Sequence, residues 1–163
     1  MFRGVIKLLL LAVLLFVAFG LGWLVARTGM GATVAVASLS ERERQFAEQM
    51  TDSSLVGRFT IAGREDAQAI PDRYDISSVE KIGDDSWRFN ARLRYGTVDT
   101  TLPIVVPLKW IDDTPVIMMS DYSIPALGTF SVRLLFIGDR YSGTWQHGQV
   151  GGHMYGRVEK QKS

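Results

Sequence analysis

The segment WRFNARLRY, from Trp87 to Tyr95, decides the fold class of this chain. Its side chains alternate between apolar and polar, and successive residues of a β-strand point to opposite faces of a sheet. The segment therefore predicts a strand with one dry face, formed by Trp87, Phe89, Ala91, Leu93 and Tyr95. The opposite face carries Arg88, Arg92 and Arg94, which we expect to pair with acids on a neighbouring strand.

Further apolar runs with a period of two follow this strand. Phe130 to Phe136 alternates in the same way, and Val98 to Trp110 keeps its large apolar side chains on one parity. Residues typical of turns separate these runs at intervals of roughly 8 to 12 residues. We expect turns at Gly63–Asp66, Gly83–Asp85, Asp112–Pro115, Pro125–Gly128, Gly138–Asp139 and Gly148–Gly152. The pattern predicts a mainly β fold, an antiparallel meander of about seven or eight strands that forms a small barrel or a sandwich.

Two prolines mark a boundary of the predicted sheet. Pro103 and Pro107 lie on the same parity of one strand, so both missing N–H groups face the same neighbour. Such a pair is tolerated at a sheet edge or a bulge. We therefore expect an edge, or the seam of a barrel, along this strand.

A short amphipathic helix is predicted before the first strand. Ser40 with Glu43 has the spacing of a capping box, and Phe46 and Met50 lie on one face of the segment. The helix should end near Thr51 to Ser53.

The charge-free run from Leu8 to Ala26 predicts a transmembrane helix. Its 19 residues give about 28 Å of helix, enough to cross a lipid bilayer. Arg3 and Lys7 precede the run, so the positive-inside rule places the N-terminus in the cytoplasm. We expect a single-pass protein of the bacterial inner membrane, with residues 1–27 as cytoplasmic N-terminus and anchor, 28–38 as a spacer, and 39–163 as a domain in the periplasm or outside. The alternative is a signal peptide cleaved at Ala35-Val36-Ala37.

Small residues form a stripe along the predicted membrane helix. Ala18, Gly22 and Ala26 are spaced four residues apart, and such stripes let two membrane helices approach closely. The stripe indicates a helix contact, with a second copy or with another membrane protein. Small residues are also simply common in membrane helices.

Composition excludes several classes of function. The chain has 18 Lys and Arg and 17 Asp and Glu, and subtracting Arg3, Lys7 and Arg27 leaves 15 basic and 17 acidic residues in the body. A body with this balance is not suited to bind nucleic acid. There is no cysteine, which excludes disulfides and cysteine zinc sites. No catalytic or nucleotide-binding motif is present, so no cofactor is predicted.

The last predicted hairpin holds the main candidate site. If Gly148–Gly152 is a five-residue loop, His147 pairs with His153 and Trp145 with Tyr155, all on one face. The cluster predicts contact with a ligand or partner; the alternative is that the aromatic rings plug a barrel end. Zinc normally needs a third protein ligand, so no metal site is predicted. The acid pairs Asp84-Asp85 and Asp112-Asp113 are interpreted as turn residues.

Two segments resemble known proteins. The segment Leu55-Val56-Gly57-Arg58-Phe59 resembles the opening Gly-x-Trp strand of lipocalin-like barrels, with Phe59 in place of the tryptophan. The ending from Tyr141 to Gly156 resembles the endings of small uncharacterised bacterial membrane-anchored envelope proteins. The first resemblance implies a calycin-like barrel, and the second implies no activity. No functional residue is carried over from either.

Three functions stay open at this point. The first is a non-catalytic, membrane-anchored binding or accessory module of the cell envelope, which holds a small apolar ligand or an envelope partner. The second is a structural accessory subunit of a larger membrane protein complex, docked through its transmembrane helix. The third is an enzyme that uses His147 and His153.

Overall fold

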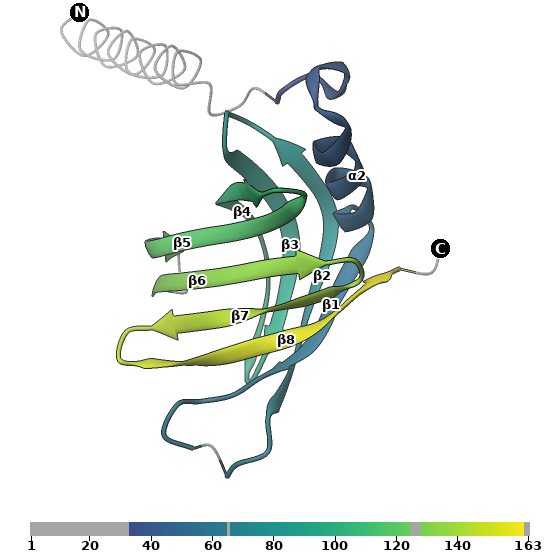
Figure 1. Ribbon diagram of the computed structural model, residues 1–163. Coiled ribbons are helices and arrows are strands. Elements are labelled where there is room, and N and C mark those ends of the chain that lie inside the picture. The colour runs from purple at the N-terminus through teal and green to yellow at the C-terminus, as the bar shows by residue number, and fades with distance from the viewer. Residues whose placement is uncertain (1–32, 65, 125–127, 162–163) are drawn as a thin grey trace, which may run out of the picture. The chain divides into compact units, whose positions relative to one another are not determined.

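The computed structural model describes residues 33–64, 66–124 and 128–161, and these residues form a closed antiparallel barrel of eight strands (Figure 1). Each strand pairs with the one that follows it in sequence, and the last pairs with the first. The predicted barrel is confirmed, and the alternative of a sandwich is wrong. The elements are η1 (Val36–Ser38), α2 (Glu41–Met50), β1 (Ser53–Phe59), β2 (Ile70–Lys81), β3 (Ser86–Tyr95), β4 (Val98–Ile111), β5 (Thr114–Ile124), β6 (Gly128–Ile137), β7 (Arg140–His147) and β8 (Val150–Lys160).

Strand β3 confirms the alternation on which the fold class was predicted. Trp87, Phe89, Ala91 and Leu93 are all buried, while Arg92 between them is exposed. The same parity continues in β4 and β6, whose inward residues join one hydrophobic core. The dry face of each strand therefore becomes the inner wall of the barrel.

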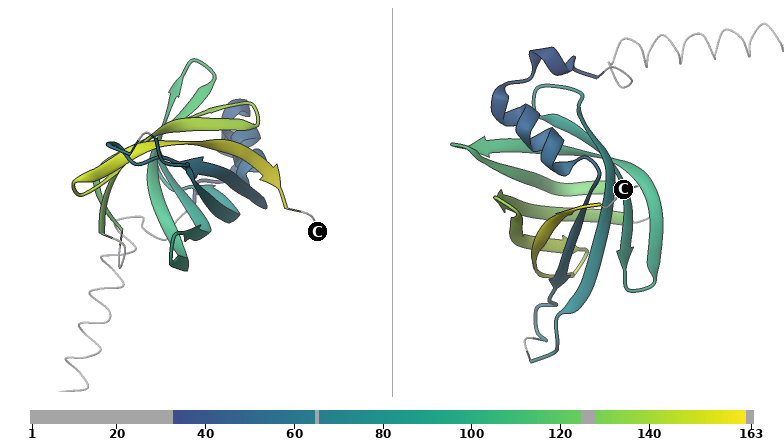
Figure 2. Two further views of the ribbon diagram at one scale, coloured as in Figure 1. Left: turned by 90° about the horizontal axis from the view of Figure 1, so that it is seen from below. Right: turned by 90° about the vertical axis from the view of Figure 1, so that its right-hand side faces the viewer.

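Helix α2 begins with the predicted capping box. The Ser40 N–H donates to the Glu43 carboxylate at 2.9 Å, and Glu43 also pairs with Lys81 of β2 at 2.6 Å. The helix ends at Met50, and the Thr51 N–H closes it on the Ala47 carbonyl at 2.9 Å. Figures 1 and 2 show α2 against one end of the barrel, where Phe46 and Met50 are buried.

The two prolines lie at a seam of the barrel. Pro103 and Pro107 face Asn90 and Ser86 of β3 on one side. On the other side, the ladder between β4 and β5 covers only Leu108–Ile111 and Thr114–Ile117 among the described residues. The prediction of a seam is confirmed, because the prolines occupy the part of β4 that makes no ladder to β5.

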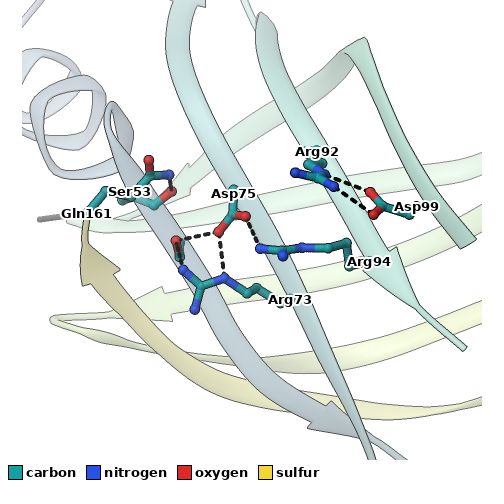
Figure 3. A network of polar contacts seen from close by, with 8 residues as sticks. Ser53, Arg73, Asp75, Arg92, Arg94, Asp99 and Gln161 are labelled. Atoms are coloured by element: carbon teal, nitrogen blue, oxygen red, sulfur yellow. Dashed lines mark hydrogen bonds and ion pairs between the residues drawn. The ribbon is translucent and has the colours of Figure 1, made fainter. Parts of the chain in front are cut away.

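The arginines of β3 lie on the outer face and pair with acids, as predicted. Arg92 forms two hydrogen bonds of 2.7 Å to Asp99 of β4. Arg94 pairs with Asp75 of β2, and Arg88 pairs with Glu80 of the same strand. Figure 3 shows how Asp75 is shared between Arg94 and Arg73. Acids on both neighbouring strands neutralise the row of arginines.

The predicted membrane anchor lies outside the described residues. The predicted helix contact of Ala18, Gly22 and Ala26 belongs to this anchor and lies outside them as well. Within the described ranges, no helix has the length and hydrophobicity to span a bilayer. Val34–Ser163 forms one compact unit. Part of the predicted spacer belongs to this unit, since residues 36–38 form η1 and the Val34 N–H donates to the Lys81 carbonyl at 2.8 Å.

Candidate ligand-binding cavity

The inside of the barrel is hollow and holds a cavity of about 460 Å³. Its wall consists of the inward side chains of the strands and of Met50 from α2. Nearly all of them are aliphatic or aromatic, because the dry faces of the strands line the space. Tyr74 and His147 are its ionisable lining residues. A cavity of this size and wall chemistry is typical of a site for a small apolar molecule.

One end of the cavity is closed by α2. The Phe46 ring stands edge-on to four rings of the barrel, with centroid distances of 5.6 to 6.3 Å. Beside it, Met50 is fully buried and lines the cavity. The apolar face of this short helix therefore forms the floor of the site.

The mouth of the cavity lies at the hairpin between β7 and β8. Of the lining residues, His147 and Val150 are exposed, and they pair with each other at the tip of this hairpin. Every other lining residue is buried or half-buried. A molecule inside the barrel would therefore meet solvent beside His147.

The predicted pairing in this hairpin is wrong. The turn consists of Gly148 and Gln149, so that His147 pairs with Val150, while Thr144 pairs with His153. Gly148 has a φ of 58°, which suits the first position of a two-residue turn. Gly152 belongs to β8, where a side chain would overlap the Thr60 carbonyl oxygen. The prediction assigned Gly151 and Gly152 to the loop because glycine is common in turns. In the structure both belong to β8, and Gly152 allows this strand to pack closely against the chain at Thr60.

The new register divides the four predicted contact residues into two pairs. Trp145 and His147 point inward and line the cavity. His153 and Tyr155 are exposed on the outer face, one on each side of buried Met154. The structure therefore brings Trp145 and His147 together and separates both from His153 and Tyr155. The two histidines cannot act as the cross-strand pair on which the enzyme hypothesis depended.

Packing fixes the orientation of both inward rings. The Trp145 indole N–H donates to the Thr60 carbonyl at 3.2 Å, and its ring stands edge-on to Phe59. The His147 imidazole stacks on Phe130 with a centroid distance of 4.3 Å and an interplanar angle of 18°. Trp145 has thus used its only polar group, whereas His147 presents an oriented imidazole at the mouth.

A buried polar pair, Asp72 and Tyr141, was not predicted. Asp72 is 4% exposed and Tyr141 is 2% exposed. The strand register places Asp72, Gly57, Gly156 and Tyr141 in one row across four neighbouring strands. A side chain at either glycine would overlap the Tyr141 hydroxyl, so the two glycines let this side chain reach toward Asp72. In the sequence, Asp72 alternates in phase with the inward-facing residues of β2, and this spacing is the pattern that could have indicated its burial.

Burial controls the ionisation of this pair. It raises the pKa of Asp72 to about 6, although the hydroxyls of Tyr74 and Tyr141 act in the opposite direction. Burial, and then the nearby Asp72 carboxylate, raise the pKa of Tyr141 as well. Among the described residues, neither Asp72 oxygen nor the Tyr141 hydroxyl completes a hydrogen bond of standard geometry. The hydroxyls therefore affect the carboxyl by proximity, and the net result is that Asp72 keeps its proton to a higher pH than a solvent-exposed carboxyl does.

The two predicted acid pairs lie in turns. Asp84 and Asp85 lie in the turn before β3, and Asp112 and Asp113 form the turn before β5, as predicted. Asp85 pairs with Lys109. Within the described part of the chain, no three His, Asp or Glu side chains are arranged to hold a metal ion. The apolar cavity is the feature on which a function can be based.

Comparisons of the chain with protein-family models, with curated proteins and with solved structures find no match, and the function is therefore inferred from the cavity itself.

Proposed function

We propose that this protein is a non-catalytic binding module, held at a membrane by its N-terminal segment, whose barrel binds a small apolar ligand. The observation that carries the proposal is the cavity of about 460 Å³ with an almost entirely apolar wall. Water in such a space makes few hydrogen bonds, and an apolar ligand that displaces it gains about 25 cal/mol for each Å² of apolar surface removed from water.

The location in the cell envelope is proposed from the sequence. The charge-free run from Leu8 to Ala26 is long enough for a membrane helix, and Arg3 and Lys7 precede it. An apolar ligand has low solubility in water and collects in membranes. A binding domain tethered to a bilayer would therefore lie close to the source of such a ligand.

Photolabelling of the full-length protein in lipid nanodiscs tests the proposal. The probe is hexadecane with a diazirine in the chain, and mass spectrometry locates the labelled residues. We expect label on Met119 and Met154, which are buried and line the cavity. Label confined to residues 1–33 would contradict ligand binding in the barrel.

A matched pair of variants shows whether the labelled methionines were reached by a probe bound inside the cavity. Ala91→Phe adds a ring to the buried lining, whereas Thr144→Phe adds the same ring to an exposed position of β7. We expect Ala91→Phe to remove most of the label from Met119 and Met154, and Thr144→Phe to leave it unchanged. Equal labelling of both variants would overturn the proposal.

A further inference from the structure

We infer that the ligand is a single-chain amphiphile, with one hydrocarbon chain inside the barrel and a carboxylate, or another anionic head group, bound by His147 at the mouth. The inference rests on the proposed function and names the class of ligand. It depends on three features of the cavity: its volume, its closed floor, and the placement of its polar groups.

The volume matches one hydrocarbon chain. An engineered protein cavity of about 150 Å³ holds one benzene molecule of six carbons. In the same proportion, the present cavity of about 460 Å³ has room for about 18 carbon atoms. A lipid with two long chains would exceed this volume, whereas one chain of about 16 carbons would fill it.

The closed floor gives the ligand one orientation. Phe46 and Met50 block the end of the barrel beside α2. The exposed lining residues, His147 and Val150, lie at the opposite end of the barrel strands, on the tip of the last hairpin. The methyl end of a chain would therefore lie near Met50, and a polar head group would remain at the mouth.

The polar groups of the wall favour an anionic head. The Trp145 N–H is occupied by the Thr60 carbonyl, and the Tyr74 hydroxyl is close enough to Asp72 to counteract part of the rise that burial causes in the pKa of that carboxyl. The His147 imidazole can donate an N–H hydrogen bond. Among the described residues that line the cavity there is no carboxylate, and buried Asp72 is not one of them. The mouth can therefore donate a hydrogen bond to an anion, whereas the described part of the lining offers no carboxylate to a cation.

The stacking of His147 on Phe130 explains why this imidazole can select a head group. A ring stacked on its neighbour at a centroid distance of 4.3 Å has fewer rotamers open to it before the ligand arrives than an unpacked ring has. Less conformational entropy is then lost when the ligand binds. His153 lacks this arrangement, because it points outward from β8 and does not line the cavity.

Competition for photolabelling of the full chain in nanodiscs tests the inference. The probe is hexadecanoate carrying a diazirine, and the competitors are hexadecanoate, hexadecan-1-ol, hexadecylamine and dipalmitoyl phosphatidate. We expect hexadecanoate to suppress the label on Met119 at a concentration about tenfold lower than the concentration of hexadecylamine that is needed. A tenfold difference in affinity is what one charge-assisted hydrogen bond would give. Dipalmitoyl phosphatidate, which has an anionic head but two chains, should not compete.

Variants of the two histidines connect this preference to the mouth. His147→Phe keeps an aromatic ring beside Phe130 but removes the N–H group, and His153→Phe makes the same change on the outer face. We expect His147→Phe to reduce the advantage of hexadecanoate over hexadecan-1-ol about tenfold, and His153→Phe to leave it unchanged. His147→Gln, which restores an N–H donor, should recover part of the advantage.

The outcomes separate this inference from the proposed function. Suppose that the hydrocarbon probe labels the cavity but all three single-chain competitors act equally. The anionic head group is then wrong, while the binding of an apolar ligand stands. The same conclusion follows if hexadecylamine competes best and loses this advantage in Asp72→Asn. Competition by dipalmitoyl phosphatidate would overturn the single-chain limit. If neither the hydrocarbon nor the hexadecanoate probe labels the cavity, the proposed function itself fails.

Discussion

Asp72 is an ionisable carboxyl group buried in strand β2, and its environment determines how pH acts on the fold. Burial raises its pKa from 3.8 in an unfolded chain to about 6. Between these values the folded chain binds more protons than the unfolded chain, so stability falls as pH rises through this window. The difference of roughly two units corresponds to about 3 kcal/mol of unfolding free energy. Asp75, whose pKa is lowered through its hydrogen bond to Ser54 and its pairing with Arg73 and Arg94, contributes in the opposite direction.

Replacing Asp72 by Asn should isolate its contribution. We expect Asp72→Asn to be more stable than the wild type at pH 8 by up to about 3 kcal/mol, and the two proteins to converge at pH 4. Urea denaturation followed by tryptophan fluorescence at several pH values measures this difference. Asp84→Asn, in an exposed turn, is the control and should follow the wild-type profile. A variant that is less stable than the wild type at pH 8 would show that the charged carboxylate stabilises the barrel.

Helix α2 is short, and tertiary contacts hold it in place. A helix of ten residues has marginal stability by itself. Its Phe46 ring is 3% exposed and packs edge-on against Trp87, Phe89, Trp110 and Phe136. This one side chain therefore connects the helix to β3, β4 and β6, and so to the floor of the cavity.

Removal of the Phe46 ring should destabilise the protein and loosen the floor. We expect Phe46→Ala to lower the unfolding free energy by about 3 to 5 kcal/mol, as is typical of a large buried ring. Glu48→Ala, on the exposed face of the same helix, should change it by less than about 0.5 kcal/mol. Urea denaturation measures both. Similar losses in the two variants would indicate that helix propensity, and not packing, determines the stability of α2.

The elements of this fold differ in how far the sequence could predict them. The strand from Trp87 and the capping box at Ser40 follow from local patterns, because alternation and capping depend on residues close in the chain. The register of the last hairpin could not be found in this way. Gly152 looks like a loop residue until the chain at Thr60 is known to pass against it. Asp72 was missed for a similar reason, since its partner Tyr141 lies three strands away.

The whole barrel is closed unevenly, and this affects how the cavity can open. Seven of the eight strand junctions have long ladders, whereas β4 and β5 share four pairs, from Leu108 opposite Ile117 to Ile111 opposite Thr114. Beyond these pairs, inward residues of both strands, among them Ile104 and Met119, line the cavity. Pro103 and Pro107 remove two amides from β4, which opposes pairing with a further strand along this seam. The seam is therefore the place where the barrel separates with the least loss of hydrogen bonds.

Hydrogen exchange of the full chain should identify the seam as the least protected part of the barrel. Amides whose ladder partner is missing exchange by small local openings, whereas those of complete ladders need larger ones. We expect alternate amides of residues 98–107 and 118–124 to exchange at least about tenfold faster than the amides of β3 and β7, measured by mass spectrometry with fragmentation. A ligand in the cavity should slow exchange most at the seam amides that adjoin the cavity-lining residues Ile104 and Met119. Uniform protection around the barrel would mean that side-chain packing closes the seam as firmly as a ladder, and the cavity would then open only at the hairpin that carries His147.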